Sequence, residues 1–195
     1  MGNLQGAGGI IGCTFGVKRR ISTVYYLYYR NCEKSEDFIV FNKLSKFANI
    51  KMIIVFPNEK ASMCINEHEK VGISGVNSGQ LLIISDDNIQ SLIDSDTEFT
   101  DNIISLIEKS RYVMIVGEGI KSLANLDILN NKTINCKKDK LTEMQKLFPK
   151  VDFRSDGNYC FVDKFCTTHD NANSKNAALI LIEKYFGEDV VKNLK

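Results

Sequence analysis

The sequence predicts an α/β fold, with a mainly parallel central sheet covered by helices and a small α+β extension after it. Two observations lead to this prediction. Several short segments are apolar along their whole length, as strands buried on both faces are. Amphipathic segments with helical spacing alternate with them. The chain has 195 residues, of which 44% are hydrophobic, so it is long enough to bury a substantial core.

The first strand and helix are read from residues 22 to 47. Residues 22–29 are rich in β-branched and aromatic side chains, which predicts a buried strand. A charged segment follows at residues 33–37. Beyond it, apolar residues recur at steps of three and four, which predicts an amphipathic helix. These residues are Phe38, Phe41, Leu44 and Phe47.

Three more apolar segments, residues 51–56, 80–85 and 112–116, are predicted strands. Between the last two, Ile103, Ile104 and Ile107 indicate a helix with one apolar face, capped by Thr100 or Asp101. The strand at 112–116 ends at Gly117-Glu118-Gly119. In such a sheet, chemistry gathers at the carboxyl ends of the strands.

The pattern changes beyond about residue 120. We expect a short helix within residues 136–148, a strand over 159–165 and a terminal helix over 174–195, capped by Asn173 or Ser174. The chain then divides into three parts. Residues 1–21 are a flexible, glycine-rich and basic segment, residues 22–120 form the α/β domain, and residues 121–195 form a C-terminal extension.

Composition restricts the partners and the cellular compartment. The formal net charge is +1, so no global field attracts nucleic acid. The six cysteines have no regular spacing, and no secretory signal segment precedes them, which predicts an intracellular, reducing environment. No apolar run is long enough to span a bilayer, so we expect no membrane association. We also expect no cofactor.

A longer pattern resembles the catalytic domain of the serine recombinases, the resolvase and invertase superfamily. In that family one strand runs into Tyr-x-Arg-x-Ser, and a later strand runs into Asp-Arg-x-x-Arg. Here "YYLYYRNCEKSED" places Tyr29, Arg30 and Cys32 on the first motif, and "LLIISDDNIQS" resembles the second. The match covers about residues 22–120 and rests on the order of elements more than on identity.

The resemblance implies a decayed catalytic site. Cys32 stands at the position of the nucleophile and Arg30 is kept. Asp87 matches the motif aspartate, whereas Asn88 and Ser91 stand where two arginines are expected. The family's arginines stabilise the transferring phosphate, and losing such a donor costs about 10²- to 10³-fold in rate. The resemblance therefore predicts a catalytically inactive pseudoenzyme that acts through self-association and through protein or nucleic-acid contacts.

Degenerate members of this superfamily occur in poxviruses. This chain is rich in Asn, Lys and Ile, as expected from an AT-rich genome, and in this it resembles such a protein. By this resemblance we expect a viral protein with a resolvase fold, derived from a DNA recombination enzyme. We expect it to form homo-oligomers in the host cytoplasm and in the nucleus or nucleolus. DNA and host nuclear proteins are its expected partners.

Two other functions stay open. A cysteine-dependent enzyme could use Cys32 for phosphoryl transfer on DNA, because thiolates are strong nucleophiles. A Rossmann-like binder of small molecules could have the same order of elements, although the first strand is not followed by a glycine-rich turn.

Two further groups of residues are candidate binding sites. Lys18, Arg19 and Arg20 form a basic cluster that is either solvated or a contact for nucleic acid. A second group could supply zinc ligands, but it lacks the paired C-x2-C spacing of zinc ribbons. The alternative is that these residues are buried thiols and a surface histidine. We expect no metal. This group is Cys136, Cys160, Cys166 and His169.

Overall fold

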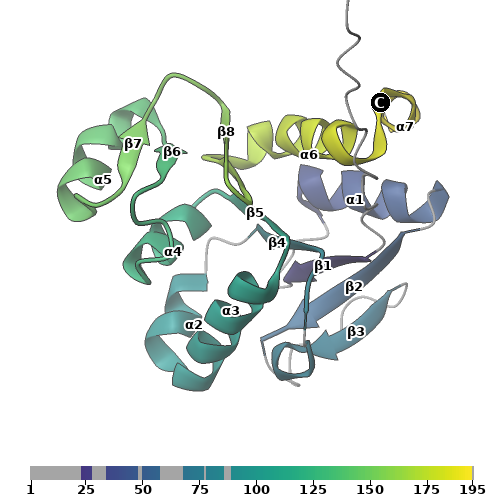
Figure 1. Ribbon diagram of the computed structural model, residues 1–195, viewed down its shortest axis with the longest axis horizontal. Helices are drawn as coiled ribbons and strands as arrows, with labels where there is room; N and C mark the ends of the chain where they lie inside the picture. The colour runs from purple at the N-terminus through teal and green to yellow at the C-terminus, as the bar shows by residue number, and fades with distance from the viewer. Residues whose placement is uncertain are drawn as a thin grey trace, which may run out of the picture.

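The fold is built on a seven-stranded sheet of order β3-β2-β1-β4-β5-β9-β8 (Figure 1). The structure, a computed structural model, describes residues 23–27, 34–47, 50–57, 68–76, 78–85 and 89–194. The strands are β1 (Thr23–Leu27), β2 (Lys51–Phe56), β3 (Glu69–Gly72), β4 (Leu81–Ser85), β5 (Tyr112–Val116), β8 (Tyr159–Val162) and β9 (Phe165–Thr168). All neighbours in this sheet are parallel except β8 and β9, so the predicted fold class is confirmed.

The central strands are buried on both faces, which explains their unbroken apolar runs. Every residue of β4 is buried, and so are the last four residues of β5. β1 pairs with β2 on one side and with β4 on the other, so the strand order reverses between β1 and β4. In open α/β sheets, the crevice at the carboxyl ends of the strands near such a reversal is the usual ligand site.

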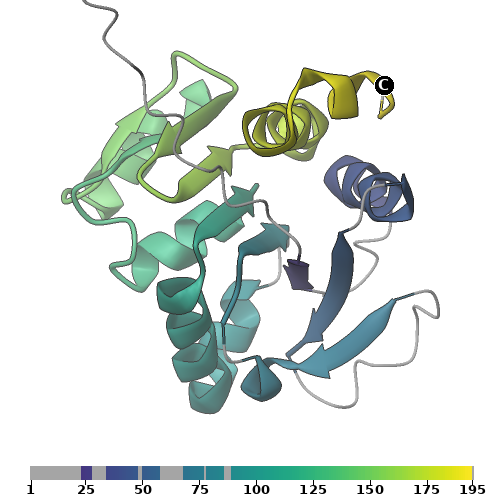
Figure 2. The same cartoon turned by 45° about the vertical axis from the view of Figure 1, so that its right-hand side comes forward.

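One face of the sheet is covered by α1 (Glu36–Phe47) and α6 (Asn171–Phe186), with the short α7 (Glu188–Lys192) after them. Figures 1 and 2 show α1 and α6 side by side on this face. Phe41 and Leu44 of α1 are fully buried, as are Ala177 and Ala178 of α6. The two small alanines allow α6 to lie close to its neighbours. α1 and α6 are far apart in the sequence but bury their apolar side chains in the same core.

The opposite face is covered by α2 (Ile89–Ser95), α3 (Thr97–Lys109) and α4 (Gly119–Asn125). The apolar stripe of α3 is buried here, and its members are Phe99, Ile103, Leu106 and Ile107. A second, two-stranded parallel sheet of β6 (Thr133–Asn135) and β7 (Asp152–Arg154) lies beside this face together with α5 (Leu141–Leu147). The turns η3 (Ile73–Gly75) and η4 (Lys138–Lys140) complete the element order.

Several elements differ from the prediction, and β3, α2, α4, β6 and β7 were not predicted. The strand expected over 159–165 is a hairpin, because the chain reverses at Asp163, whose φ is 50°, and β8 pairs antiparallel with β9. The cap of α3 is Asp96, whose side chain accepts from the Phe99 amide at 2.9 Å. The cap of α6 is Asp170, which accepts from the Asn173 amide at 2.8 Å. Each cap is an aspartate earlier in the chain than the predicted cap.

Within the described residues, no helix has the length and apolar composition needed to cross a bilayer. The longest, α6, has 16 residues.

Candidate functional site

The site begins with a buried carboxyl group where the strand order reverses. Asp37, in the first turn of α1, is fully buried. The Tyr26 hydroxyl donates to its Oδ2 at 2.7 Å, and the Ser85 hydroxyl donates to its Oδ1 at 3.3 Å. Tyr26 and Ser85 lie towards the carboxyl ends of β1 and β4, so three elements meet at this one acid.

A sharp turn from strand to helix follows β5, the next strand of the sheet. Gly117 has a φ of 63°, a conformation that glycine adopts without strain, and α4 begins two residues later at Gly119. The Gly117 amide donates to the Thr168 carbonyl at 2.9 Å, which fixes the turn to the end of β9. In α/β enzymes such a turn often exposes a nucleophilic side chain. Here the residue with that φ is a glycine, so this position brings only backbone to the site.

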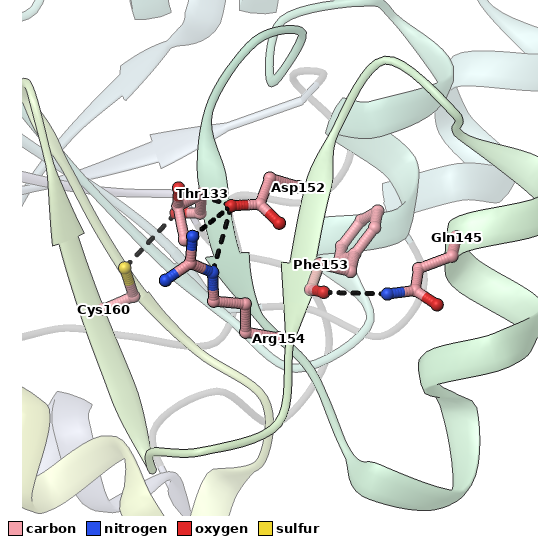
Figure 3. Close-up of polar contacts among 6 residues, drawn as sticks. All are labelled: Thr133, Gln145, Asp152, Phe153, Arg154 and Cys160. Carbon is pink, nitrogen blue, oxygen red and sulfur yellow. Dashed lines mark hydrogen bonds and ion pairs between the residues drawn. The ribbon is translucent and has the colours of Figure 1, made fainter.

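The small sheet of β6 and β7 positions Cys136. The Cys136 amide donates to the Arg154 carbonyl at 2.8 Å, and its side chain is buried. Figure 3 shows the polar contacts that hold this sheet together. Asp152 Oδ2 accepts from the Arg154 guanidinium at 2.8 Å and from the Thr133 hydroxyl at 2.9 Å. The Gln145 amide donates to the Phe153 carbonyl at 3.2 Å, which ties α5 to β7.

These segments enclose a pocket at the carboxyl edge of β5 and β9. Its walls come from the turn after β5, the segment after β6, the helix α5 and the end of β9. The pocket has an interior of about 60 Å³, and about 450 Å³ when the open space at its mouth is included. Cys136 and His169 both line it, although 32 residues lie between them in the sequence.

Charged side chains surround the pocket. Glu143 lies between two lysines, with Lys140 at 3.3 Å and Lys121 at 3.6 Å. The hydrogen bond from Lys140 and the positive charges of both lysines lower the pKa of the Glu143 carboxyl. Glu118 and Lys137 also line the pocket, and both are exposed.

The Cys136 thiol is not activated in this arrangement. Burial raises its pKa, and the negative charge of Asp139 raises it further. A thiol in this environment stays protonated at neutral pH, and thiolate chemistry would require a ligand or a rearrangement that lowers its pKa.

His169 presents an unused acceptor. Its Nε2 lies 3.4 Å from Asp170 Oδ2, which favours a proton on Nε2 in the neutral ring. Its Nδ1 is buried and has no hydrogen-bond partner among the described residues. Buried polar atoms are normally satisfied, so an unpartnered one beside a pocket marks a place for a ligand or an ordered water.

The proposed zinc ligands do not converge. Cys166 packs in the core under α1 and α6, whereas the Cys160 thiol points to the other side and donates to the Thr133 carbonyl at 3.3 Å. The alternation of side chains along paired strands separates them in this way. Only Cys136 and His169 share the pocket, and the described residues contain no group of three or more metal-ligating side chains placed to hold an ion.

The structure says less about the other predicted residues. Ser91 is exposed in α2, and its carbonyl accepts from the Ser95 hydroxyl at 2.6 Å. The rest lie outside the described residues, namely Lys18, Arg19, Arg20, Arg30, Cys32, Asp87 and Asn88.

Sequence reasoning missed two contributors to the pocket, the Gly117 turn and Glu118, and it missed the buried Asp37, which does not line the pocket. Asp37 was assigned to a charged segment, and only its place one residue before an apolar helical face hinted at burial. Gly117-Glu118-Gly119 was recognised as the end of a strand. A glycine directly between an apolar strand and a helix was the available signal that backbone approaches a ligand site there.

The fold is similar to that of solved DJ-1, ThiJ and PfpI proteins. DJ-1beta from Drosophila melanogaster superposes with a TM-score of 0.65 and 12% identity, over 89% of this chain and 95% of that chain. A ThiJ/PfpI family protein from Pseudomonas syringae gives 0.68 and 12%, over 96% and 79%. Oxidized DJ-1 from Toxoplasma gondii gives 0.65 and 16%, over 89% and 95%. No protein-family model and no curated protein matches the sequence.

These neighbours overturn the recombinase resemblance. The chain has a DJ-1-like fold, so the expectations of a resolvase fold, a poxvirus protein and a DNA recombination ancestry are wrong. Strands alternating with helices occur in many α/β folds, and the order of elements alone did not distinguish between them. The conclusion that the chain is a non-enzymatic pseudoenzyme is corrected with it. It was drawn from arginines missing from a recombinase site, and this fold does not contain that site.

Proposed function

We propose that the protein binds a small polar molecule in the pocket at the carboxyl edge of β5 and β9. The observation that carries this proposal is the convergence of side chains from four separate segments on one small cavity. The unpartnered His169 Nδ1 supports it, because a ligand with a donor group would satisfy that buried atom. The place of the pocket in the sheet also supports it, since strand ends are where α/β folds bind ligands.

The interior is too small for a nucleotide. At about 60 Å³ it has room for roughly four to six water molecules, so a ligand of only a few heavy atoms can be enclosed. The lining combines an apolar side with charged groups, as small-molecule sites do.

Ligand-observed NMR with the full chain tests the proposal. The protein is mixed with amino acids, short hydroxy acids, aldehydes and monosaccharides, and transfer of saturation to each compound is recorded. We expect at least one class to bind, and Lys121→Trp, which fills the rim of the pocket, to abolish the signal. Lys146→Trp is the matched control, because Lys146 is an exposed lysine of α5 outside the pocket. Binding that survives Lys121→Trp unchanged would place the ligand elsewhere.

Thiol chemistry at Cys136 is a second candidate function, favoured by one observation. Cys136 lines the same pocket as the His169 imidazole, and a nearby base is the usual means of activating a thiol. The test is alkylation by iodoacetamide, with modified peptides counted by mass spectrometry with and without bound ligand. Cys136 should react faster when the ligand binds and its pKa falls. Reaction at Cys160 with none at Cys136 under both conditions would refute this function.

A further inference from the structure

Five charged side chains line the pocket. Three of them form ion pairs with one another, and the other two have no ion-pair partner among the described residues; we call these two the unsatisfied pair. Glu143 has an ion-pair partner for each of its oxygens, with Lys121 beside Oε1 and Lys140 beside Oε2. This triad carries a net charge of +1, because two lysines face one carboxylate, but each of its charged groups already has an ion-pair partner.

Glu118 and Lys137 form the unsatisfied pair. Glu118 precedes α4 and makes no side-chain capping bond to it. Neither residue has an ion pair or a side-chain hydrogen bond within the part of the chain that the structure describes, yet both line the pocket. One free negative charge and one free positive charge therefore border the same small cavity.

The two charges are placed on different walls. Glu118 follows Gly117, whose amide bonds to the Thr168 carbonyl, and His169 comes directly after Thr168. Glu118 and His169 thus lie at neighbouring strand ends. Lys137 follows Cys136 on the wall formed after β6. The wall at the ends of β5 and β9 offers acceptors, a carboxylate and the unpartnered His169 Nδ1, and the wall after β6 offers an ammonium.

We propose that the ligand of this pocket is a free α-amino acid with a small side chain. Its ammonium group lies between Glu118 and His169 Nδ1, and its carboxylate pairs with Lys137. A zwitterion matches both unsatisfied charges and donates to the buried acceptor, whereas a simple anion or cation leaves one of them unmatched. This inference rests on the proposed function, because it names the class of ligand that the same pocket takes.

Calorimetric titration of the full chain with L-serine, N-acetyl-L-serine and serinol tests the inference. N-acetylation removes the ammonium charge, and serinol lacks the carboxylate. We expect L-serine to bind and each analogue to bind at least about tenfold more weakly, as the loss of one charge-assisted hydrogen bond predicts. The affinity for L-serine should also fall as the salt concentration rises.

Two variants assign the charges. Glu118→Gln should weaken the binding of L-serine about fivefold or more and should leave the ratio of the L-serine and serinol affinities unchanged, because both ligands carry the ammonium group. Lys137→Gln should weaken the binding of L-serine but leave that of serinol unchanged, because serinol has no carboxylate. Lys138→Gln is the matched control, since Lys138 is an exposed neighbouring lysine that does not line the pocket. Equal loss in the Lys138 variant would show a general charge effect and overturn the assignment of Lys137.

The two proposals fail in different ways. If other compounds from the NMR experiment bind in the pocket but L-serine does not, or its two analogues bind equally well, the amino-acid inference is wrong and small-molecule binding stands. If no compound gives a signal that Lys121→Trp removes, the proposed function itself is wrong.

Discussion

Thr167 and Thr168 are adjacent in β9 and equally buried, yet only one of them has a hydrogen-bond partner. The Thr168 hydroxyl donates to the Asn158 carbonyl at 2.9 Å, whereas the Thr167 hydroxyl has no partner among the described residues. Side chains alternate along a strand, so the two hydroxyls face opposite sides of the sheet.

This pair predicts opposite effects of the same substitution. Thr168→Val should lower the free energy of unfolding by about 1 kcal/mol, because a hydrogen bond is lost. Thr167→Val should leave stability unchanged or raise it, because valine has the same shape and removes an unsatisfied hydroxyl. Urea denaturation of both variants measures the difference. Equal destabilisation would mean that an ordered water or ligand normally satisfies Thr167.

The buried Asp37 predicts that the adjacent residues Tyr25 and Tyr26 differ in how much their hydroxyl groups stabilise the fold. Tyr26→Phe removes the 2.7 Å hydrogen bond to Asp37 and should lower the free energy of unfolding by about 2 kcal/mol. Tyr25→Phe is the control, because the half-buried Tyr25 faces the other side of β1. A small effect of Tyr26→Phe would show that the Asp37 carboxyl finds another donor when the hydroxyl is gone.

The reactivity of Cys136 should depend on Asp139. The negative charge of Asp139 helps to raise the pKa of the Cys136 thiol, so Asp139→Asn should increase the thiolate fraction at a given pH. Alkylation of Cys136 near pH 8 should then become faster, on the order of twofold for one nearby surface charge. Asp101→Asn, on the exposed side of α3, should leave the rate unchanged. If both variants react at the wild-type rate, burial alone sets the pKa.

Alkaline pH should destabilise the fold through Cys166. Burial raises the pKa of its thiol from 9.0 to about 12. Between those values the unfolded chain has lost the proton and the folded chain keeps it, so stability is full below pH 9 and falls as pH rises towards 12. The slope from one such group is at most about 1.4 kcal/mol per pH unit.

Other groups titrate in the same range, so a variant isolates this contribution. Cys166→Ala should be less stable at neutral pH because a cavity is created, but its stability should fall less steeply above pH 9 than that of the wild type. Urea midpoints measured across the range give both slopes. Parallel curves would contradict the assignment to Cys166.

The sequence identified the central strands because burial on both faces leaves an apolar run, as in β4 and β5, but it missed β3, β6 and β7. It identified the site poorly because the pocket depends on contacts between distant segments. Nothing local connects Cys136 to His169, and nothing in the run around Asp37 shows that a carboxyl group there is enclosed by Tyr26 and Ser85. The family was misjudged for a similar reason. The order of β1, α1, β2, β4, α3 and β5 was read correctly, but the sequence did not show that β9 lies beside β5.

The position of β9 also bears on how the protein is made. β5 ends at residue 116, but its neighbour β9 begins only at residue 165, and α6, which covers the same core as α1, comes later still. A ribosome must therefore translate the whole segment from β5 to β9 before β5 gains its second partner. Until then the emerging polypeptide exposes an open strand edge and an uncovered apolar face. Such surfaces are bound by chaperones, and without chaperones they cause aggregation. The main sheet and its helical cover are therefore completed only after β9 and α6 have been synthesised.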